Sequence, residues 1–172
     1  MPNRMETAAA RTAGKIHGVA ARMHGLTGVF KTLASEHAEM KAMFDRVVAR
    51  PDRRAELWPA IRKALVSHER GELNVVYPVL YTHAATQELA RAHEMDAKEL
   101  ESLIDKLDMT DIHTLVWERL FDRLVGAVTA HAEREEKEIF PIALEALDAA
   151  TVKDLDAKFK EAQRQIELAM PA

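Results

Sequence analysis

A chain of 172 residues, 48% of them hydrophobic, is long enough to build one domain around a single core. Its net charge of −4 and its pI of about 6.1 give no electrostatic reason to expect nucleic acid as a partner. The chain contains no cysteine, which excludes disulfides, thiolate catalysis and cysteine-ligated metal sites. Any bound metal must therefore be held by His, Asp or Glu side chains.

The N-terminal segment, residues 1–26, is basic and rich in alanine. Organelle transit peptides share this composition. Ile16, Val19, Met23 and Leu26 keep helical spacing, however, and we expect an additional helix packed on the main fold. No apolar run approaches the roughly 20 residues that span a bilayer, and no signal-peptide core is visible. We expect a cytoplasmic protein with no membrane partner.

Helix-forming residues dominate the rest of the chain, and apolar residues recur every three or four positions. A first helix is predicted at about residues 27–49, followed by a break at Arg50-Pro51-Asp52, where Asp52 can cap the next helix. The second helix runs to about His83, and Pro59 and Pro78 are expected to kink it or to delay its start. The inward residues are expected to be Phe30, Leu33, Met40, Phe44 and Val47, then Leu57, Ile61, Leu65, Val76 and Val79.

A third helix is predicted near residues 86–107, a fourth and longest at about 112–147, and a fifth after Asp148. Their inward residues are expected to be Leu89, Leu100, Ile104 and Leu107, then Leu124, Val128, Ile139 and Ile142, then Val152, Leu155, Phe159 and Ile166. The sequence shows no strand pattern, and short connections imply antiparallel neighbours. We therefore predict an all-α fold, an up-down-up-down four-helix bundle at residues 27–148, with further helical segments at 1–26 and 149–172.

Each inward ridge of the predicted bundle has a polar interruption near its middle. A single His interrupts the first and the third helix, and a His–Glu pair spaced by four residues interrupts the second and the fourth. These residues are His37, His93, His68 with Glu72, and His131 with Glu135. Burying six ionisable groups without compensation would be very costly. Residues four apart lie about 40° apart on a helix, so each pair can reach a common point beside the helix axis.

Four imidazoles and two carboxylates at one level of a bundle suit two metal ions about 3.5–4 Å apart. Each ion would take two histidines, Glu72 and Glu135 would bridge the ions, and an oxygen atom from solvent would complete the bridge. Iron, zinc and manganese all accept this set of ligands. The alternative is a group of core histidines that are hydrogen-bonded to glutamates.

The two His–Glu pairs belong to one repeated frame, HERGELNVVYP and HAEREEKEIFP, which reads His, three residues, Glu, four residues, an aromatic and Pro. The aromatics, Tyr77 and Phe140, follow the His by nine residues and would lie about 180° round an ideal helix. We expect them to face away from the metals. The proline that ends each copy frees a backbone carbonyl and is expected to bend its helix.

Other polar residues are weaker candidates. Glu69 projects about 80° from the mean direction of His68 and Glu72, so it is either a supplementary ligand or a solvated neighbour. His113 and His83 lie too far along their helices to join the cluster, about 27 Å and about 16 Å away. His17 and His24 share a face of the N-terminal segment, and we set aside a second metal site there.

With these residues the chain resembles the hemerythrin-like family, the HHE cation-binding domain, over about residues 29–147. The resemblance rests on His37, His93 and the two frames. It implies a four-helix bundle that holds a non-haem di-iron centre. The implied cofactor is two iron ions with an oxo or hydroxo bridge, and zinc and manganese are the alternatives. The implied metal ligands are His37, His68, Glu72, His93, His131 and Glu135.

The sequence also departs from the oxygen-carrying hemerythrins, which place a second His four residues from the first on the third helix. Here the flanking positions of His93 are Leu89 and Ala97, and the fourth-helix carboxylate is Glu135 rather than an Asp one place later. The set is similar to that of di-iron proteins linked to iron–sulfur cluster repair, which carry a further, cysteine-containing domain. We predict a protein that binds or senses dioxygen, nitric oxide or peroxide. The alternatives are a di-iron peroxidase or catalase-like enzyme and an iron-handling module.

Overall fold

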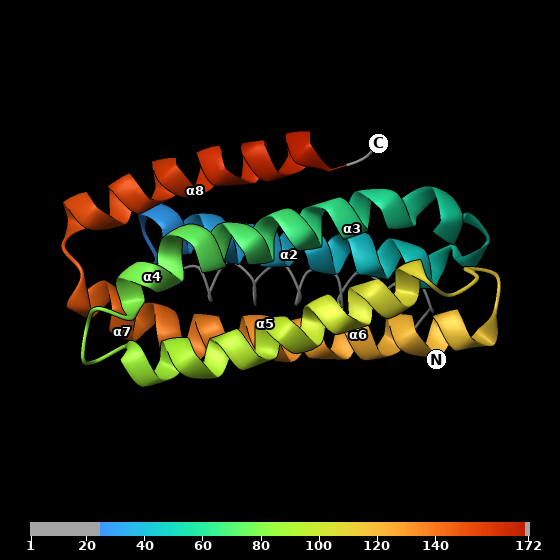
Figure 1. Ribbon diagram of the computed structural model, residues 1–172, viewed down its shortest axis with the longest axis horizontal. Coiled ribbons are helices and arrows are strands. Elements are labelled where there is room, and N and C mark those ends of the chain that lie inside the picture. Colours follow the sequence, from blue (N-terminus) through green and yellow to red (C-terminus); the bar gives the residue numbers. More distant parts are fainter. Residues whose placement is uncertain (1–24, 171–172) are drawn as a thin grey trace, which may run out of the picture.

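The computed structural model describes residues 25–170, and it shows four antiparallel rods with one further helix laid against them (Figure 1). The predicted all-α four-helix bundle is confirmed, and no strand forms within the described part of the chain. The expected N-terminal helix and the pair His17 and His24 lie outside the described residues. The helices are α2 (Gly28–Ala49), α3 (Arg54–Gly71), α4 (Tyr77–Leu80), α5 (Gln87–Asp108), α6 (Leu115–Arg134), α7 (Phe140–Ala146) and α8 (Ala149–Ala169).

Two of the four rods are composite helices. A five-residue π-helix, η2 (Glu72–Val76), joins α3 to α4, and a second, η3 (Glu135–Ile139), joins α6 to α7. A short 3₁₀ turn, η1 (Pro51–Arg53), connects α2 to α3. Asp52 lies in this turn and binds Arg50, so the expectation that it caps the second helix is wrong. Pro59 lies inside α3 and does not delay the start of that helix.

The two π-helices shift the register of everything that follows them. The amide of Tyr77 bonds the carbonyl of Glu72, five residues back, and Phe140 bonds Glu135 in the same way. The proline that follows each aromatic has no amide hydrogen, and its ring would clash with the carbonyl four residues earlier, so a widened turn relieves the helix at this point. The bend expected at each proline is therefore a one-residue widening of the turn.

The register shift also corrects two of the predicted inward positions. Val79 is only half-buried and Ile142 is 36% exposed, whereas Leu80 and Ala143, one residue further on, are both 0% exposed. One extra residue in a turn sets the following side chains back by about 100°. A constant period of 3.6 residues could not have anticipated this change.

The core consists of two apolar clusters, one towards each end of the bundle. One contains Phe30, Leu33, Leu80 and Phe140, and the other contains Met40, Phe44, Trp58, Ile61, Leu100, Trp117 and Phe121. The polar interruptions predicted from the sequence fall between the two clusters. The buried polar side chains therefore lie in the middle of the bundle, between two apolar ends.

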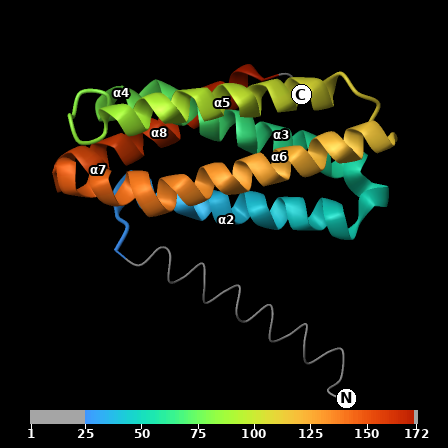
Figure 2. The ribbon, with the colours of Figure 1, turned by 90° about the horizontal axis from the view of Figure 1, so that it is seen from below.

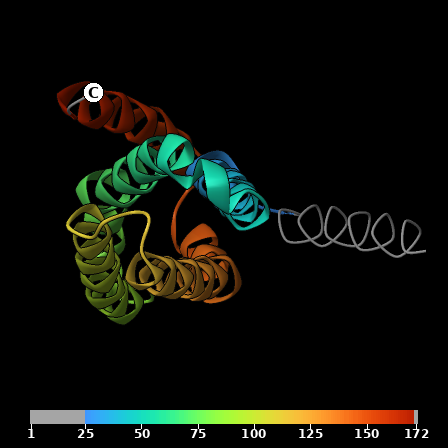
Figure 3. The same cartoon turned by 90° about the vertical axis from the view of Figure 1, so that its right-hand side faces the viewer.

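The C-terminal helix α8 packs along α2 and α3 on the outside of the bundle (Figures 1–3). Its residues Val152, Leu155 and Phe159 are buried, as the spacing predicted. Among residues 25–170, no helix combines the length and the apolar character needed to cross a membrane.

Gly71, the last residue of α3, permits the close approach of α8. A β-carbon at this position would lie 2.8 Å from Cε2 of Phe159 and 3.2 Å from Cγ of Gln163. Phe159 is fully buried, so its ring has little room to move aside. Gly126, in α6, is exposed, and a β-carbon there would meet nothing within 4 Å.

We predict that Gly71→Ala destabilises the protein, because the overpacking against Phe159 costs about 1–3 kcal/mol. The gain in helix propensity, about 0.8–1.0 kcal/mol, does not offset this cost. The matched change Gly126→Ala keeps only the gain and should raise the unfolding temperature. Thermal unfolding followed by circular dichroism measures both. An equal rise in the two variants would show that α8 does not pack on Gly71.

Candidate metal centre

The six side chains that the sequence singled out lie together in the middle of the bundle. All are buried, with at most 6% of their surface exposed. They are His37 from α2, His68 and Glu72 from α3 and η2, His93 from α5, and His131 and Glu135 from α6 and η3. The four rods thus bring together the whole predicted set, although its role in binding metal stays a prediction.

The ligand atoms of these six residues and of Glu69 form two groups. In each group, one nitrogen or oxygen atom from every residue lies within 4.8 Å of the others. The first group is His37, His68 and Glu135, and the second is Glu69, Glu72, His93 and His131. The pairing of two imidazoles in each group agrees with the arrangement expected for two ions.

Glu72 and Glu135 each face imidazoles of both groups. The Oε2 atom of Glu72 lies 3.5 Å from Nε2 of His68 and 3.6 Å from Nε2 of His93. Glu135 places Oε2 3.2 Å from Nε2 of His37 and Oε1 3.0 Å from Nε2 of His93. These positions between the groups are the ones that bridging carboxylates would occupy.

Glu69 is a buried member of the second group and not a solvated neighbour. It is 7% exposed, and its Oε1 atom lies 3.4 Å from Nε2 of His131 on the opposite rod. The position directly after a His ligand candidate was the only sequence signal for it. Its projection on an ideal helix left the question open, because the reach across to α6 depends on how the rods pack.

Several of these buried polar atoms have no hydrogen-bond partner, although they lie close together. They are Oε2 of Glu69, both carboxylate oxygens of Glu72, both ring nitrogens of His93, Nε2 of His131 and Oε2 of Glu135. Their short separations lack the directions that hydrogen bonds require. Buried polar groups are normally satisfied. Side chains that face one another without bonding one another fit a cation ligand set, since imidazole and carboxylate lone pairs are what such cations need.

Carboxylates outside the groups orient two of the histidines. Nδ1 of His37 donates to Oε1 of Glu136 at 3.0 Å, and Nδ1 of His68 donates to Oε2 of Glu36 at 2.8 Å. Such bonds fix the tautomer and leave the Nε2 lone pair facing the site. Gln163 of α8 in turn donates to the same Oε2 of Glu36 at 2.8 Å. The sequence alone did not reveal these partners, although both acids are next neighbours of site residues.

The expectation that Tyr77 and Phe140 face away from the site is wrong. The hydroxyl of Tyr77 donates to Oε1 of Glu135 at 2.6 Å, and its ring stacks on that of His93 with a centroid separation of 3.5 Å. The ring of Phe140 lies nearly parallel to that of His37, with centroids 6.1 Å apart. The π-helices turn both aromatics inward, and the proline that ends each frame was the signal for this.

The protonation of the site follows from burial and from neighbouring charges. Burial lowers the pKa of His37, but the close carboxylate of Glu135 and the hydrogen bond to Glu136 overcome this effect and raise that pKa to about 10. Burial lowers the pKa of His131 to about 4. Burial and the charge of Glu135 raise the pKa of Glu72 well above its usual value. At neutral pH, a proton therefore occupies His37, and a cation must displace it.

We predict that cation binding releases protons and weakens as the pH falls. With a pKa of about 10, His37 is protonated at neutral pH, and a protonated imidazole cannot ligate. Affinity should fall about tenfold per pH unit for each proton released. Calorimetric titration of chelator-treated protein with Fe²⁺ or Zn²⁺, in buffers with different ionisation enthalpies, counts these protons. A binding enthalpy that is the same in every buffer would contradict the prediction.

The two distant histidines belong to neither group. His113 is exposed in the turn between α5 and α6, and His83 is half-buried in the turn after α4, where its Nδ1 atom lies 3.1 Å from the carbonyl of Val79. These positions agree with the prediction that both histidines lie away from the cluster.

Comparison with known proteins identifies the class to which this fold and site belong. The model of the hemerythrin HHE cation binding domain matches residues 28–143, and the chain belongs to this family. A solved structure of a hemerythrin HHE cation binding domain-containing protein from Mycobacterium kansasii has a similar fold, with a TM-score of 0.73. It shares 20% sequence identity, over 84% of this chain and 90% of that chain. A search of curated proteins found no match.

Proposed function

We propose that this chain holds two iron ions between the four rods and that it binds or senses a small oxidant, namely dioxygen, nitric oxide or peroxide. The observation that carries the proposal is the set of seven buried His and Glu side chains in two adjoining groups. The chain's membership of the hemerythrin HHE cation binding domain family supports cation binding. A cytoplasmic location, expected from the sequence, remains part of the proposal.

Each group would hold one ion. His37 and His68 would be the terminal ligands of the first ion and His93 and His131 those of the second, with Glu69 as an additional ligand of the second. Glu72 and Glu135 would bridge the two ions, as their contacts with both groups suggest. Bound iron would supply sites for a small ligand. Unlike zinc, which has no redox chemistry, it would also supply electrons for the reduction of that ligand.

The protein's own side chains prepare this chemistry. Tyr77 holds one oxygen of Glu135 by its hydroxyl, which fixes the carboxylate and places a proton within reach of the site. Glu36 and Glu136 orient the two imidazoles of the first group. The apolar clusters on both sides exclude bulk water, which strengthens every electrostatic interaction inside.

A sensing role gains support from α8. The hydrogen bonds from Gln163 to Glu36 and from His68 to Glu36 connect this outer helix to the first group. Phe159 of the same helix lies edge-on to the ring of His68, with centroids 6.1 Å apart. A change at the first ion would therefore alter contacts of a helix that a partner can reach.

The alternative is a peroxidase or catalase-like enzyme. One feature favours it, the buried phenol of Tyr77 beside Glu135, because the cleavage of peroxide consumes protons. A peroxide experiment separates this activity from binding or sensing.

We predict that the purified protein contains two iron ions per chain and that the oxidised form absorbs in the near ultraviolet. Metal analysis and an absorption spectrum test this. One equivalent of hydrogen peroxide should then produce a stoichiometric spectral change, whereas sustained oxygen release would favour the enzyme. A colourless protein loaded with zinc would argue against both.

We predict that Glu72→Ala and Glu135→Ala each lose most of the bound iron, because each removes a carboxylate that faces both groups. The matched control His113→Ala changes an exposed turn and should retain full iron content. Iron analysis after gel filtration, with circular dichroism to confirm folding, measures the effect. Full iron content in the folded Glu variants would remove them from the ligand set.

A further inference from the structure

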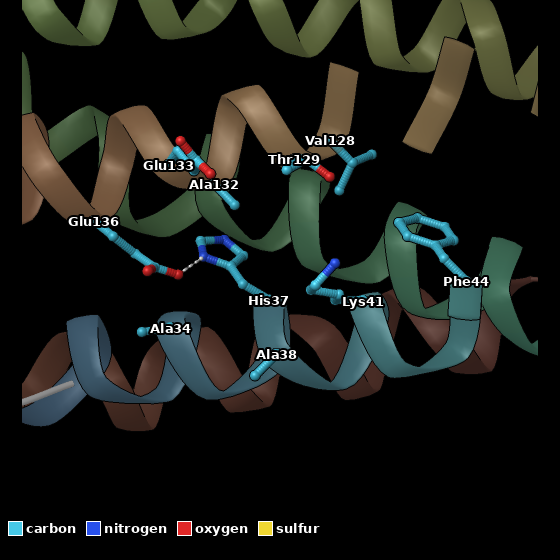
Figure 4. Close-up of a pocket in the computed structure, with 10 residues that line it drawn as sticks. All are labelled: Ala34, His37, Ala38, Lys41, Phe44, Val128, Thr129, Ala132, Glu133 and Glu136. Atoms are coloured by element: carbon cyan, nitrogen blue, oxygen red, sulfur yellow. Dashed lines mark hydrogen bonds and ion pairs between the residues drawn. The ribbon is translucent and has the colours of Figure 1, made fainter. Parts of the chain in front are cut away.

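Three recesses lead from the surface of the bundle towards the candidate metal centre. The one between α5 and α6 is lined by His131 but is bordered by the charged side chains of Asp96, Glu99 and Arg134. The other two have a more apolar lining. One lies between α2 and α6, has a volume of about 60 Å³ and is lined in part by Ala34, Ala38 and Ala132 (Figure 4). The other runs along the seam between α5 and the rod formed by α3, η2 and α4. It consists of two hollows of about 30 and 310 Å³ that share Leu73, Ala97 and Glu101, and we call it the α3–α5 groove.

The recess between α2 and α6 is closed at its inner end by a histidine ring. Figure 4 shows His37 and Glu136 joined across it. Nδ1 of His37 is occupied by Glu136, and its Nε2 faces the interior, 3.1 Å from Nε2 of His68. A molecule in this recess would therefore meet the back of an imidazole and not the ligand atoms.

The α3–α5 groove reaches the second group directly. Glu69 and Tyr77 line the groove. Oε1 of Glu69 lies 3.4 Å from Nε2 of His131, and the ring of Tyr77 stacks on that of His93. Oε2 of Glu69 is buried and has no hydrogen-bond partner. The groove therefore meets Glu69 of the second group, and the side chains of Glu69 and Tyr77 lie between it and the imidazoles of His93 and His131.

Ala97 keeps the inner part of the groove open. It follows His93 by four residues, so it lies on the same face of α5. It is 4% exposed and lines both hollows. A methyl group is the smallest side chain that a non-glycine residue can place there, and a larger one would extend into the hollows that Ala97 lines together with Leu73.

The lining of the groove indicates the kind of molecule that it admits. Its rim carries two ion pairs, Arg70 with Glu101 and Lys98 with Glu94, each with a separation of 2.8 Å. The charges of the rim cancel, so the rim attracts neither anions nor cations. Apart from these ion pairs, the lining is apolar except for Glu69, Tyr77 and Tyr81, and Glu69 would repel an anion if ionised.

We infer that the α3–α5 groove is the route by which a small uncharged oxidant, such as dioxygen, nitric oxide or hydrogen peroxide, reaches the ion held by the second group. This inference rests on the proposed function. It assigns Ala97 and Leu73 the control of access, and it makes the ion at His93 and His131 the one that the oxidant meets.

The first test compares Ala97→Leu with Ala132→Leu, each of which fills one recess. Ala97→Leu should retain two iron ions but should slow the spectral reaction with hydrogen peroxide about tenfold, equivalent to ~1.4 kcal/mol of added barrier. Ala132→Leu should leave that rate unchanged. A wild-type rate for Ala97→Leu, or slowing in Ala132→Leu alone, would overturn the inference. Ala97→Val provides a smaller change if the Leu variant does not fold.

The second test does not depend on iron. Dissolved dioxygen is paramagnetic and speeds the relaxation of the protons that it visits, so NMR of the full chain loaded with zinc maps its path. The methyl protons of Ala97 and Leu73 should relax faster under oxygen pressure than those of Ala90, which is buried on the same helix. Equal rates would reject the groove. If the protein as purified contains no iron but its zinc-loaded form shows this pattern, the proposed function is refuted and the groove remains supported.

Discussion

Burying an ionised side chain in a bundle core costs several kcal/mol for each charged group unless partners compensate. This constraint shapes the whole molecule. Seven His and Glu side chains occupy the middle of the bundle in two groups. The hydrogen bonds in the structure do not satisfy all of their atoms, since seven of the buried ligand atoms lack a partner. The apolar clusters at the two ends hold the rods in place against this cost, and a cation would complete the ligand set in the middle.

The side chains around the centre provide some of the partners that the buried polar groups need. Glu36 and Glu136 satisfy the outer nitrogens of the first group, and Tyr77 satisfies one oxygen of Glu135. The helix α8 adds the contact between Gln163 and Glu36 and buries Phe159 against Gly71. The first group is thus surrounded by bonded partners, whereas the second group is bounded by the groove at Ala97.

Most of the fold could be predicted from the sequence, because the period of apolar residues marks each rod and the polar interruptions mark one common level. The same interruptions predicted His37, His68 and the other members of the set, since their spacing fixes the faces of the helices. The positions of Tyr77, Phe140 and Ile142 could not be predicted in this way, because an ideal period does not contain the π-helices. Glu69 and Gln163 depend on contacts between rods, which spacing along one helix does not encode.

The two π-helices also have a consequence for how related sequences are compared. Each lies directly after a carboxylate of the site and adds one residue that the rise of a regular helix would not include. The side chains at the ends of these two rods therefore do not follow the helical period of the residues before the π-helix. An alignment that tolerates no offset within the frame would pair Val79 and Ile142 with core positions, and a homology search based on hydrophobic phase alone would lose the inward aromatics.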